Sequence, residues 1–263
     1  MAVWSDLNSR LASGAAMALV GVVMIWLGGI WFGTLAALVS GIMVWELARM
    51  MAPEQRNAAL QLGLAAAIAL LVARAFGGLW VAPLIGAVAV QGVSTLRISN
   101  SNKLLFVLFS IGILGAGTGL TWFRDTYGIV WLVWLVLVVI ATDVFGYFAG
   151  RLVGGPKFWP AISPKKTWSG TVAGWVAAAL LGLAFRQFTN AGPDLPWISM
   201  ALSMASQGGD MAESALKRRM GVKDSSSLIP GHGGLFDRFD GLLAGALFML
   251  LVSQLVYVPE VRI

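Results

Sequence analysis

Residues 128–149 read GIVWLVWLVLVVIATDVFGYFA, an almost uninterrupted apolar run. About 20 such residues suffice for an α-helix to cross a bilayer core. Eight further runs of this kind occur, at 12–29, 31–48, 58–76, 79–94, 104–123, 168–189, 196–212 and 239–258. We therefore predict an all-α, polytopic integral membrane protein with about nine transmembrane helices. Eight is the alternative count, because the 79–94 run is short and polar residues interrupt the 196–212 run.

The composition of the 263-residue chain agrees with this class. Hydrophobic residues make up 58% and charged residues 11%, against about 25% charged in an ordinary soluble domain. Such a chain is neither a disordered protein nor a nucleic-acid-binding basic domain. Cysteine is absent, which excludes a disulfide scaffold and a thiolate zinc site.

The positions of Lys and Arg predict the orientation. With a cytoplasmic N-terminus and nine spans, all of these residues lie on the cytoplasmic side except Arg74, Arg124, Arg186 and Arg262. The polar loops at 150–167 and 213–238 then face the cytoplasm. We expect an N-terminal transmembrane part, 1–127, and a second part, 128–263, that carries the chemistry. In the first part, Glu46 and Arg49 are interpreted as a local pair or as snorkelling side chains at a span end.

One carboxylate lies inside the quoted apolar run. Asp143 is flanked by apolar residues from Val138 to Phe148. A charged side chain at this depth costs about 2.5–3.5 kcal/mol on the insertion scale. We expect a metal ion, a cation or a water-filled cavity to offset this cost, with an interhelical ion pair as the alternative.

The loop that follows has the features of a phosphate site. Pro164 fixes the backbone, and residues 165–170 are predicted to open the next helix. Helix N-termini offer free amide donors to anions. Ser163, Lys165, Lys166 and Thr167 would complete a phosphate cradle. The alternative is unspecific anchoring of the lysines to anionic lipid headgroups.

The richest segment is 207–241. Asp210, Glu213, Ser214 and Lys217 have the spacing of one polar stripe on a helix. A loop follows in which the single histidine, His232, lies between glycines, which favours close approach of the backbone to a ligand. Asp237 and Asp240 then share one face at the start of the last predicted helix.

Four carboxylates beside several basic residues favour a magnesium site. Hard oxygen ligands suit Mg²⁺, which leaves its other positions to water and substrate phosphates. Basic side chains would hold the rest of a polyphosphate. The alternative is an amphipathic cytoplasmic loop with ordinary salt bridges.

The same segment resembles the signature of the phosphatidate cytidylyltransferase (CDP-diacylglycerol synthase) family. The matching fixed positions are Ser214, Lys217, Arg218, Lys223, Asp224, Ser226, Pro230, His232, Gly233, Gly234, Asp237, Arg238 and Asp240. Two upstream elements also match, Asp143-x-x-Gly146-Tyr147-x-x-Gly150-Arg151 and Ser163-Pro164-Lys165-Lys166-Thr167-Trp168. One departure is Ser169, where many family members have Glu.

The resemblance implies that CTP and phosphatidate react to give CDP-diacylglycerol and pyrophosphate at the inner face of a bacterial-type cytoplasmic membrane. It also implies Mg²⁺ dependence, a monovalent partner cation such as K⁺, and a homodimer. The expected catalytic residues are Asp210, Lys217, Lys223, Asp224, His232, Asp237, Arg238 and Asp240. The expected phosphate-binding residues are Ser163, Lys165, Lys166, Thr167, Ser214, Lys217, Arg218, Lys223 and Arg238. The expected metal ligands are Asp210, Glu213, Asp237, Asp240 and Asp143.

Two other functions remain open from the sequence. A CTP-dependent polyprenol or dolichol-type lipid kinase would transfer the γ-phosphate and release CDP. A cation-coupled transporter would use the membrane carboxylates Asp143 and Asp210, although it would not account for the basic loops and the His-Gly-Gly sequence.

Overall fold

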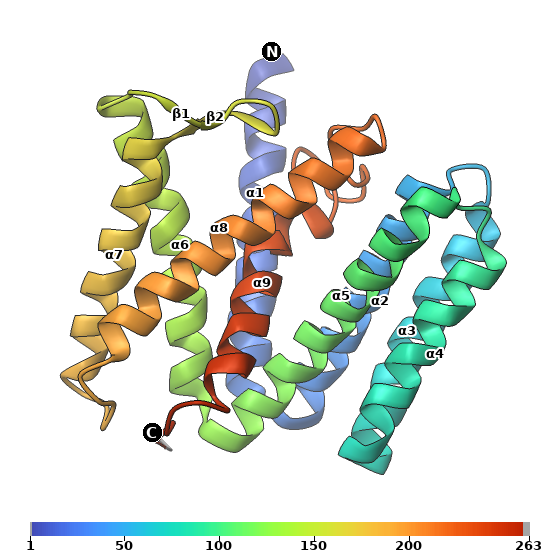
Figure 1. Ribbon diagram of the computed structural model, residues 1–263, viewed down its shortest axis with the longest axis horizontal. Helices are drawn as coiled ribbons and strands as arrows, with labels where there is room; N and C mark the ends of the chain where they lie inside the picture. The colour runs from blue at the N-terminus through green and yellow to red at the C-terminus, as the bar shows by residue number, and fades with distance from the viewer. Residues whose placement is uncertain (1, 260–263) are drawn as a thin grey trace. The chain divides into compact units, whose positions relative to one another are not determined.

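A computed structural model describes residues 2–259, with side chains from residue 11 onward, so that Arg262 lies outside the described residues. Within that range the chain is a set of α-helices with one short hairpin (Figure 1). The helices are α1 (Ala2–Leu27), α2 (Gly29–Met51), α3 (Arg56–Phe76), α4 (Val81–Thr95), α5 (Asn100–Tyr127), α6 (Ile129–Leu152), α7 (Trp168–Arg186), α8 (Leu195–Arg219) and α9 (Phe236–Val252). A 3-10 turn, η1 (Gly78–Trp80), precedes α4. The two strands are β1 (Lys157–Trp159) and β2 (Ser163–Thr167).

Each predicted apolar run overlaps one of these helices. Among the described residues, six helical segments are long and apolar enough to cross a membrane: Gly29–Met51, Arg56–Phe76, Gly78–Thr95, Asn100–Tyr127, Ile129–Leu152 and Trp168–Arg186. The all-α prediction is confirmed, and the chain is an integral membrane protein. The count of nine spans and the orientation of the N-terminus stay predictions.

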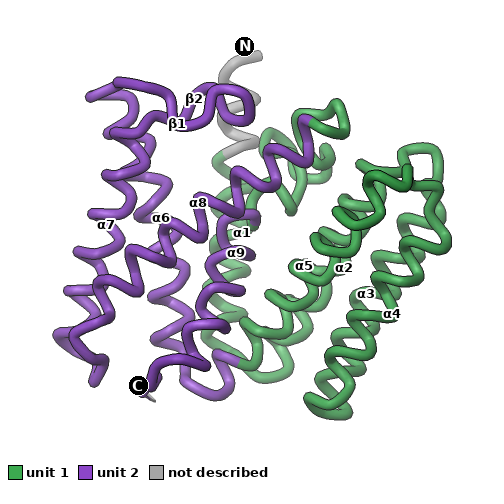
Figure 2. Tube along the Cα trace, in the orientation of Figure 1, with its two compact units in different colours: residues 1–122, 219–239 green, residues 123–218, 240–263 purple. Residues whose placement is uncertain are grey.

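The chain forms two compact units, coloured separately in Figure 2. The first comprises residues 1–122 and 219–239. Its helices α2 and α3 approach closely at Gly41 and Gly63, where a Cβ on Gly41 would meet the carbonyl oxygen of Gly63 at 2.7 Å. Small residues allow such close backbone packing between apolar helices.

The second unit comprises residues 123–218 and 240–263. Here α6 and α7 meet at Gly146 and Gly170, and a Cβ on Gly146 would lie 3.2 Å from the Gly170 carbonyl oxygen. Buried polar contacts tie α6 to α8: Thr142 donates to Ser203 Oγ at 2.7 Å, and the Trp134 indole donates to Ser199 Oγ at 3.0 Å.

Two local predictions about the polar segments were wrong. Residues 165–167 do not open a helix, because 163–167 pair as strand β2 with β1, with Lys157 opposite Thr167. The strand suits Pro164, which disfavours helical backbone at the residue before it. Helix α7 begins only at Trp168, with the Thr167 hydroxyl as its N-cap, accepting from the Gly170 amide at 3.2 Å. The predicted loop at 213–238 is also shorter, since α8 continues to Arg219 and α9 begins at Phe236.

Candidate active site

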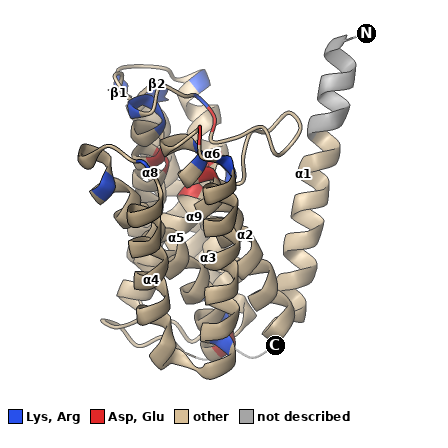
Figure 3. Cartoon of the chain, turned by 90° about the vertical axis from the view of Figure 1, so that its right-hand side faces the viewer, with Lys and Arg blue, Asp and Glu red and all other residues tan. Residues whose placement is uncertain are grey.

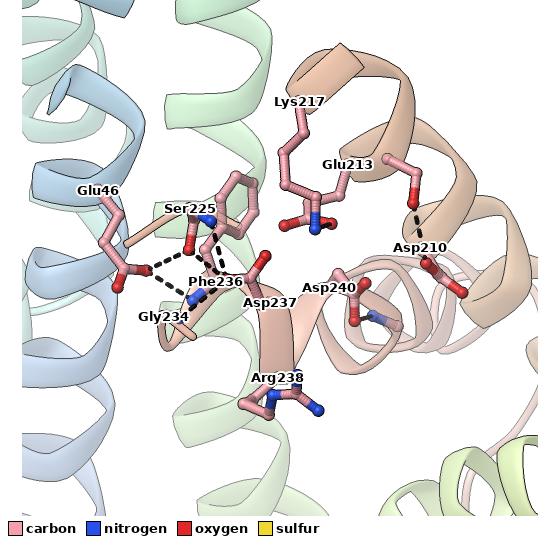
Figure 4. A network of polar contacts seen from close by, with 12 residues as sticks. Glu46, Asp210, Glu213, Lys217, Ser225, Gly234, Phe236, Asp237, Arg238 and Asp240 are labelled. Carbon is pink, nitrogen blue, oxygen red and sulfur yellow. Dashed lines mark hydrogen bonds and ion pairs between the residues drawn. The ribbon is translucent and has the colours of Figure 1, made fainter. Parts of the chain in front are cut away.

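Three carboxylates of the second unit converge between α8 and α9. One ligand oxygen each from Asp210, Glu213 and Asp240 lies within 4.8 Å of the others (Figure 4). The convergence depends on Gly209, because a Cβ there would lie 2.6 Å from the Asp240 carbonyl oxygen and so would push α9 away. Glu213 is buried, whereas Asp210 and Asp240 are partly accessible. This carboxylate cluster, Asp210/Glu213/Asp240, contains three of the five predicted metal ligands.

Two lysines and a serine surround the cluster. Lys217, one helical turn after Glu213, pairs with it at 2.5 Å. Lys166 of β2 forms an ion pair with Asp210, and Ser214 Oγ donates to Asp210 Oδ1 at 3.4 Å. The three carboxylates outnumber the two lysines described as their partners. Oxygen donors at this spacing fit a hard divalent cation such as Mg²⁺.

A pocket of about 330 Å³ lies in the same unit, between α6, α7 and the β hairpin. Its lining includes four predicted site residues, Asp143, Lys165, Lys166 and Thr167, together with Thr142, Gly146, Tyr147, Gly150, Arg151, Gly170, Thr171 and Gln207. Figure 3 shows basic positions in blue on the β1–β2 hairpin. The pocket is therefore bordered by cations from the hairpin and by the carboxylate of Asp143, as expected for a site that takes an anionic group with a cation.

Sequence reasoning gave the other eight lining residues no site role, among them Tyr147, Arg151 and Gln207. Arg151 donates to the Tyr147 hydroxyl at 2.8 Å, and Gln207 accepts from the Trp175 indole at 2.9 Å. Tyr147 and Arg151 stood in the upstream Asp143 element, so the signal was present. Ser169, the departure from the family pattern, does not line the pocket, and its hydroxyl donates to the Gly154 carbonyl oxygen at 2.5 Å.

A second carboxylate network lies in the first unit, around Asp237. Its Oδ2 atom accepts from the Ser225 amide at 2.9 Å, the Ser225 hydroxyl at 2.9 Å and the Gly234 amide at 2.8 Å. A Cβ on Gly233, which has φ of +79°, would lie 2.8 Å from this same oxygen. The glycines beside His232 thus make room for carboxylate side chains of the protein itself, rather than only for a ligand as predicted.

Sequence reasoning missed the contacts that Glu46 makes with the loop. Its fully buried side chain accepts from the Ser226 hydroxyl and from the amides of Leu235 and Phe236, and Ser225 Oγ lies 3.3 Å from its Oε2. The interpretation of Glu46 as a local pair or a snorkelling residue is corrected by these contacts. A lone glutamate in an apolar helix was the only sequence signal, because its partners lie about 180 positions further along the chain.

The other predicted site residues lie on strand β2, at helix ends and in the loop between α8 and α9. His232 Nδ1 lies 2.9 Å from Ser13 Oγ, and Arg238 Nε donates to the His232 carbonyl oxygen at 2.9 Å. Ser163 lies on β2, and Arg218 is exposed at the end of α8. Lys223 and Asp224 are exposed in the loop between α8 and α9. Their roles toward substrate stay predictions.

Comparison with known proteins agrees with these features. The model of the cytidylyltransferase family matches residues 8–256. A phosphatidate cytidylyltransferase of Brucella abortus is 33% identical over 262 residues, covering 98% of this chain and 97% of the relative. One from Staphylococcus saprophyticus is 40% identical over 142 residues, or 52% of this chain and 54% of the relative. The chain belongs to the cytidylyltransferase family.

Proposed function

We propose that this protein is a phosphatidate cytidylyltransferase, which converts CTP and phosphatidate into CDP-diacylglycerol and pyrophosphate. The observation that carries the proposal is the carboxylate cluster Asp210/Glu213/Asp240, flanked by Lys166 and Lys217, in a chain of this family. The full-length similarity to relatives of that name supports the substrate pair.

The reaction joins two anions. A phosphate oxygen of phosphatidate attacks the α-phosphorus of CTP, a new P–O bond forms, and the bond to the bridging oxygen breaks so that pyrophosphate leaves. The phosphatidate oxygen is already anionic and needs no strong base. The main barrier is the repulsion between the two phosphate groups, which positioned cations can lower.

In this proposal Asp210, Glu213 and Asp240 would hold Mg²⁺, with Asp143 and Asp237 as further predicted ligands. When bound, the ion would offset charge on the CTP phosphates and on the leaving pyrophosphate. A monovalent ion such as K⁺ beside it remains part of the proposal from family resemblance alone. Lys165, Lys166 and Lys217 would bind the anionic oxygens and keep both substrates in line.

The membrane placement follows from the same reasoning. We propose nine spans with the N-terminus and the site at the cytoplasmic face, where CTP is supplied, and a homodimer as the assembly. Large apolar side chains on the outside of α6 and α7, such as Phe145, Phe148 and Val176, are exposed and suited to lipid contact. Acyl chains could therefore stay in the bilayer while the headgroup enters the pocket beside these helices.

The test is product analysis with purified protein, CTP, phosphatidate and Mg²⁺. We expect a CDP-lipid and stoichiometric pyrophosphate, and we expect EDTA to stop both. Release of CDP with a phosphorylated polyprenol would assign a lipid kinase instead. Cation flux in proteoliposomes without CTP would favour a transporter.

A further inference from the structure

Glu46 holds the loop that carries much of the family signature. We propose that this residue is a positioning residue for cytidylyl transfer: from α2 it fixes the 224–236 loop, and through Ser225 it fixes the carboxylate of Asp237. The inference rests on the proposed function, since this loop carries predicted catalytic residues.

Both carboxylate oxygens of Glu46 accept hydrogen bonds from the loop and the start of α9. Oε1 accepts from Ser226 Oγ at 2.6 Å and from the Leu235 amide at 3.0 Å. Oε2 accepts from the Phe236 amide at 2.7 Å. Ser225 Oγ lies 3.3 Å from Oε2 and 2.9 Å from Asp237 Oδ2, so its single hydroxyl proton is shared between the two carboxylates. Two of the donors to Glu46 are backbone amides at the start of α9, which have no acceptor within their own helix. A carboxylate from another helix thus caps α9.

Ser225 connects Glu46 to Asp237 (Figure 4). Its hydroxyl lies 2.9 Å from Asp237 Oδ2, and its amide donates to the same oxygen. The Gly234 amide supplies a third donor to Asp237. Rotation of Asp237 would break all three contacts, so the loop that Glu46 holds also determines the orientation of this signature carboxylate.

Burial of the Glu46 carboxylate is energetically costly unless hydrogen bonds such as those from the loop compensate for it. The side chain is fully buried in α2, and a buried carboxylate without hydrogen bonds is strongly disfavoured. An apolar residue could fill the same volume without that penalty. The space at Gly234 is already taken by Glu46 Oε1 and Ser225 Oγ, and a Cβ there would collide with both. The Glu46 side chain and the Ser225 hydroxyl therefore pack where only a glycine at position 234 leaves room for them.

The direct test is Glu46→Gln. The amide nitrogen cannot accept from the loop, so one half of the cap is lost while side-chain volume is kept. We expect kcat to fall about 10²-fold, as for other displacements of reacting groups by remote changes. We expect Glu46→Asp, which restores both acceptor oxygens, to recover part of the loss. Glu54→Gln, which alters an exposed carboxylate just after α2, is the matched control and should leave kcat unchanged.

Hydrogen exchange of the same proteins separates positioning from general destabilisation. We expect Glu46→Gln to speed exchange of peptides within 224–236 and to leave those of α3 and α6 unchanged. This measurement needs no activity, so it tests the clamp even if the proposed reaction proves wrong. Normal kcat and unchanged loop exchange would overturn the inference.

A second variant covers the case in which Glu46→Gln fails to fold. Ser226→Ala removes the 2.6 Å contact to Oε1, together with the acceptor of the Leu228 amide, and leaves the buried carboxylate in place. We expect a several-fold loss of kcat with faster exchange of the loop. Full activity of Ser226→Ala together with unfolding of Glu46→Gln would make Glu46 a structural residue only and would contradict the proposal.

Discussion

The two carboxylate groups of this protein have opposite surroundings. Glu46 and Asp237 receive hydrogen bonds from serine hydroxyls and backbone amides, which are neutral donors fixed by the chain. Asp210 and Glu213 face lysine ammonium groups and lie near a third carboxylate, that of Asp240. Carboxylates that accept from donors fixed by the chain are suited to shaping a loop. The closely spaced carboxylate oxygens of the cluster, paired with flexible lysine side chains, are suited to binding a metal ion and phosphates.

The largest effect that would sharpen this contrast is expected from Asp240→Asn. It removes a charge from the carboxylate cluster and should lower kcat more than about 10²-fold. This loss is larger than that expected for residues that only hydrogen-bond to metal ligands. Steady-state rates at several Mg²⁺ concentrations give the measurement. Asp194→Asn changes an exposed carboxylate of the same unit and should have no effect. A near-normal rate for Asp240→Asn would remove it from the ion site.

Asp237→Asn probes the other carboxylate group and should reduce kcat about 10²-fold. An amide oxygen accepts more weakly than a carboxylate, so the three donors of Ser225 and Gly234 would be held less firmly. The fold should persist, because the buried contacts of α2 and α3 are untouched. Turnover and hydrogen exchange of the loop are the measurements, and wild-type turnover would exclude a role for Asp237 in the reaction.

A smaller effect is expected from Lys166→Gln. Loss of this cation removes a charge-assisted contact at the pocket and should raise the KM of at least one phosphate substrate about tenfold. Since Lys166 also pairs with Asp210, kcat should fall as well, but less than in Asp240→Asn. Lys157→Gln, on the exposed strand β1 of the same hairpin, is the control. Unchanged KM values for both substrates would place Lys166 outside the phosphate site.

Much of the fold was predictable because each helix carries its own signal. A run of about 20 apolar residues specifies a helix wherever it lies, and α6 and α7 begin and end within a few residues of the predicted spans. The stripe from Asp210 to Lys217 was predictable for the same reason, since its spacing is local. Asp240 lies beyond the loop 220–235, on the first turns of α9.

Features that depend on distant contacts were not predictable. Nothing near Glu46 in the sequence indicates Ser225, Ser226 or the start of α9, so a capping role could not be derived from its neighbours. The strand at Lys165 depends on pairing with β1, and two lysines beside a helix start gave a misleading local signal. Asp237 and Asp240 looked equivalent from their spacing on one helix face, yet Asp237 anchors the loop and Asp240 joins the carboxylate cluster.

Binding of Mn²⁺, a paramagnetic substitute for Mg²⁺, to purified protein tests the central claim most directly. The free ion can be followed by electron paramagnetic resonance without any turnover. The account predicts that the protein binds Mn²⁺ in competition with Mg²⁺ and that Asp210→Asn weakens this binding at least about tenfold. Equal affinity in the two proteins, or no competition by Mg²⁺, would contradict the assignment of Asp210, Glu213 and Asp240 as the ion site.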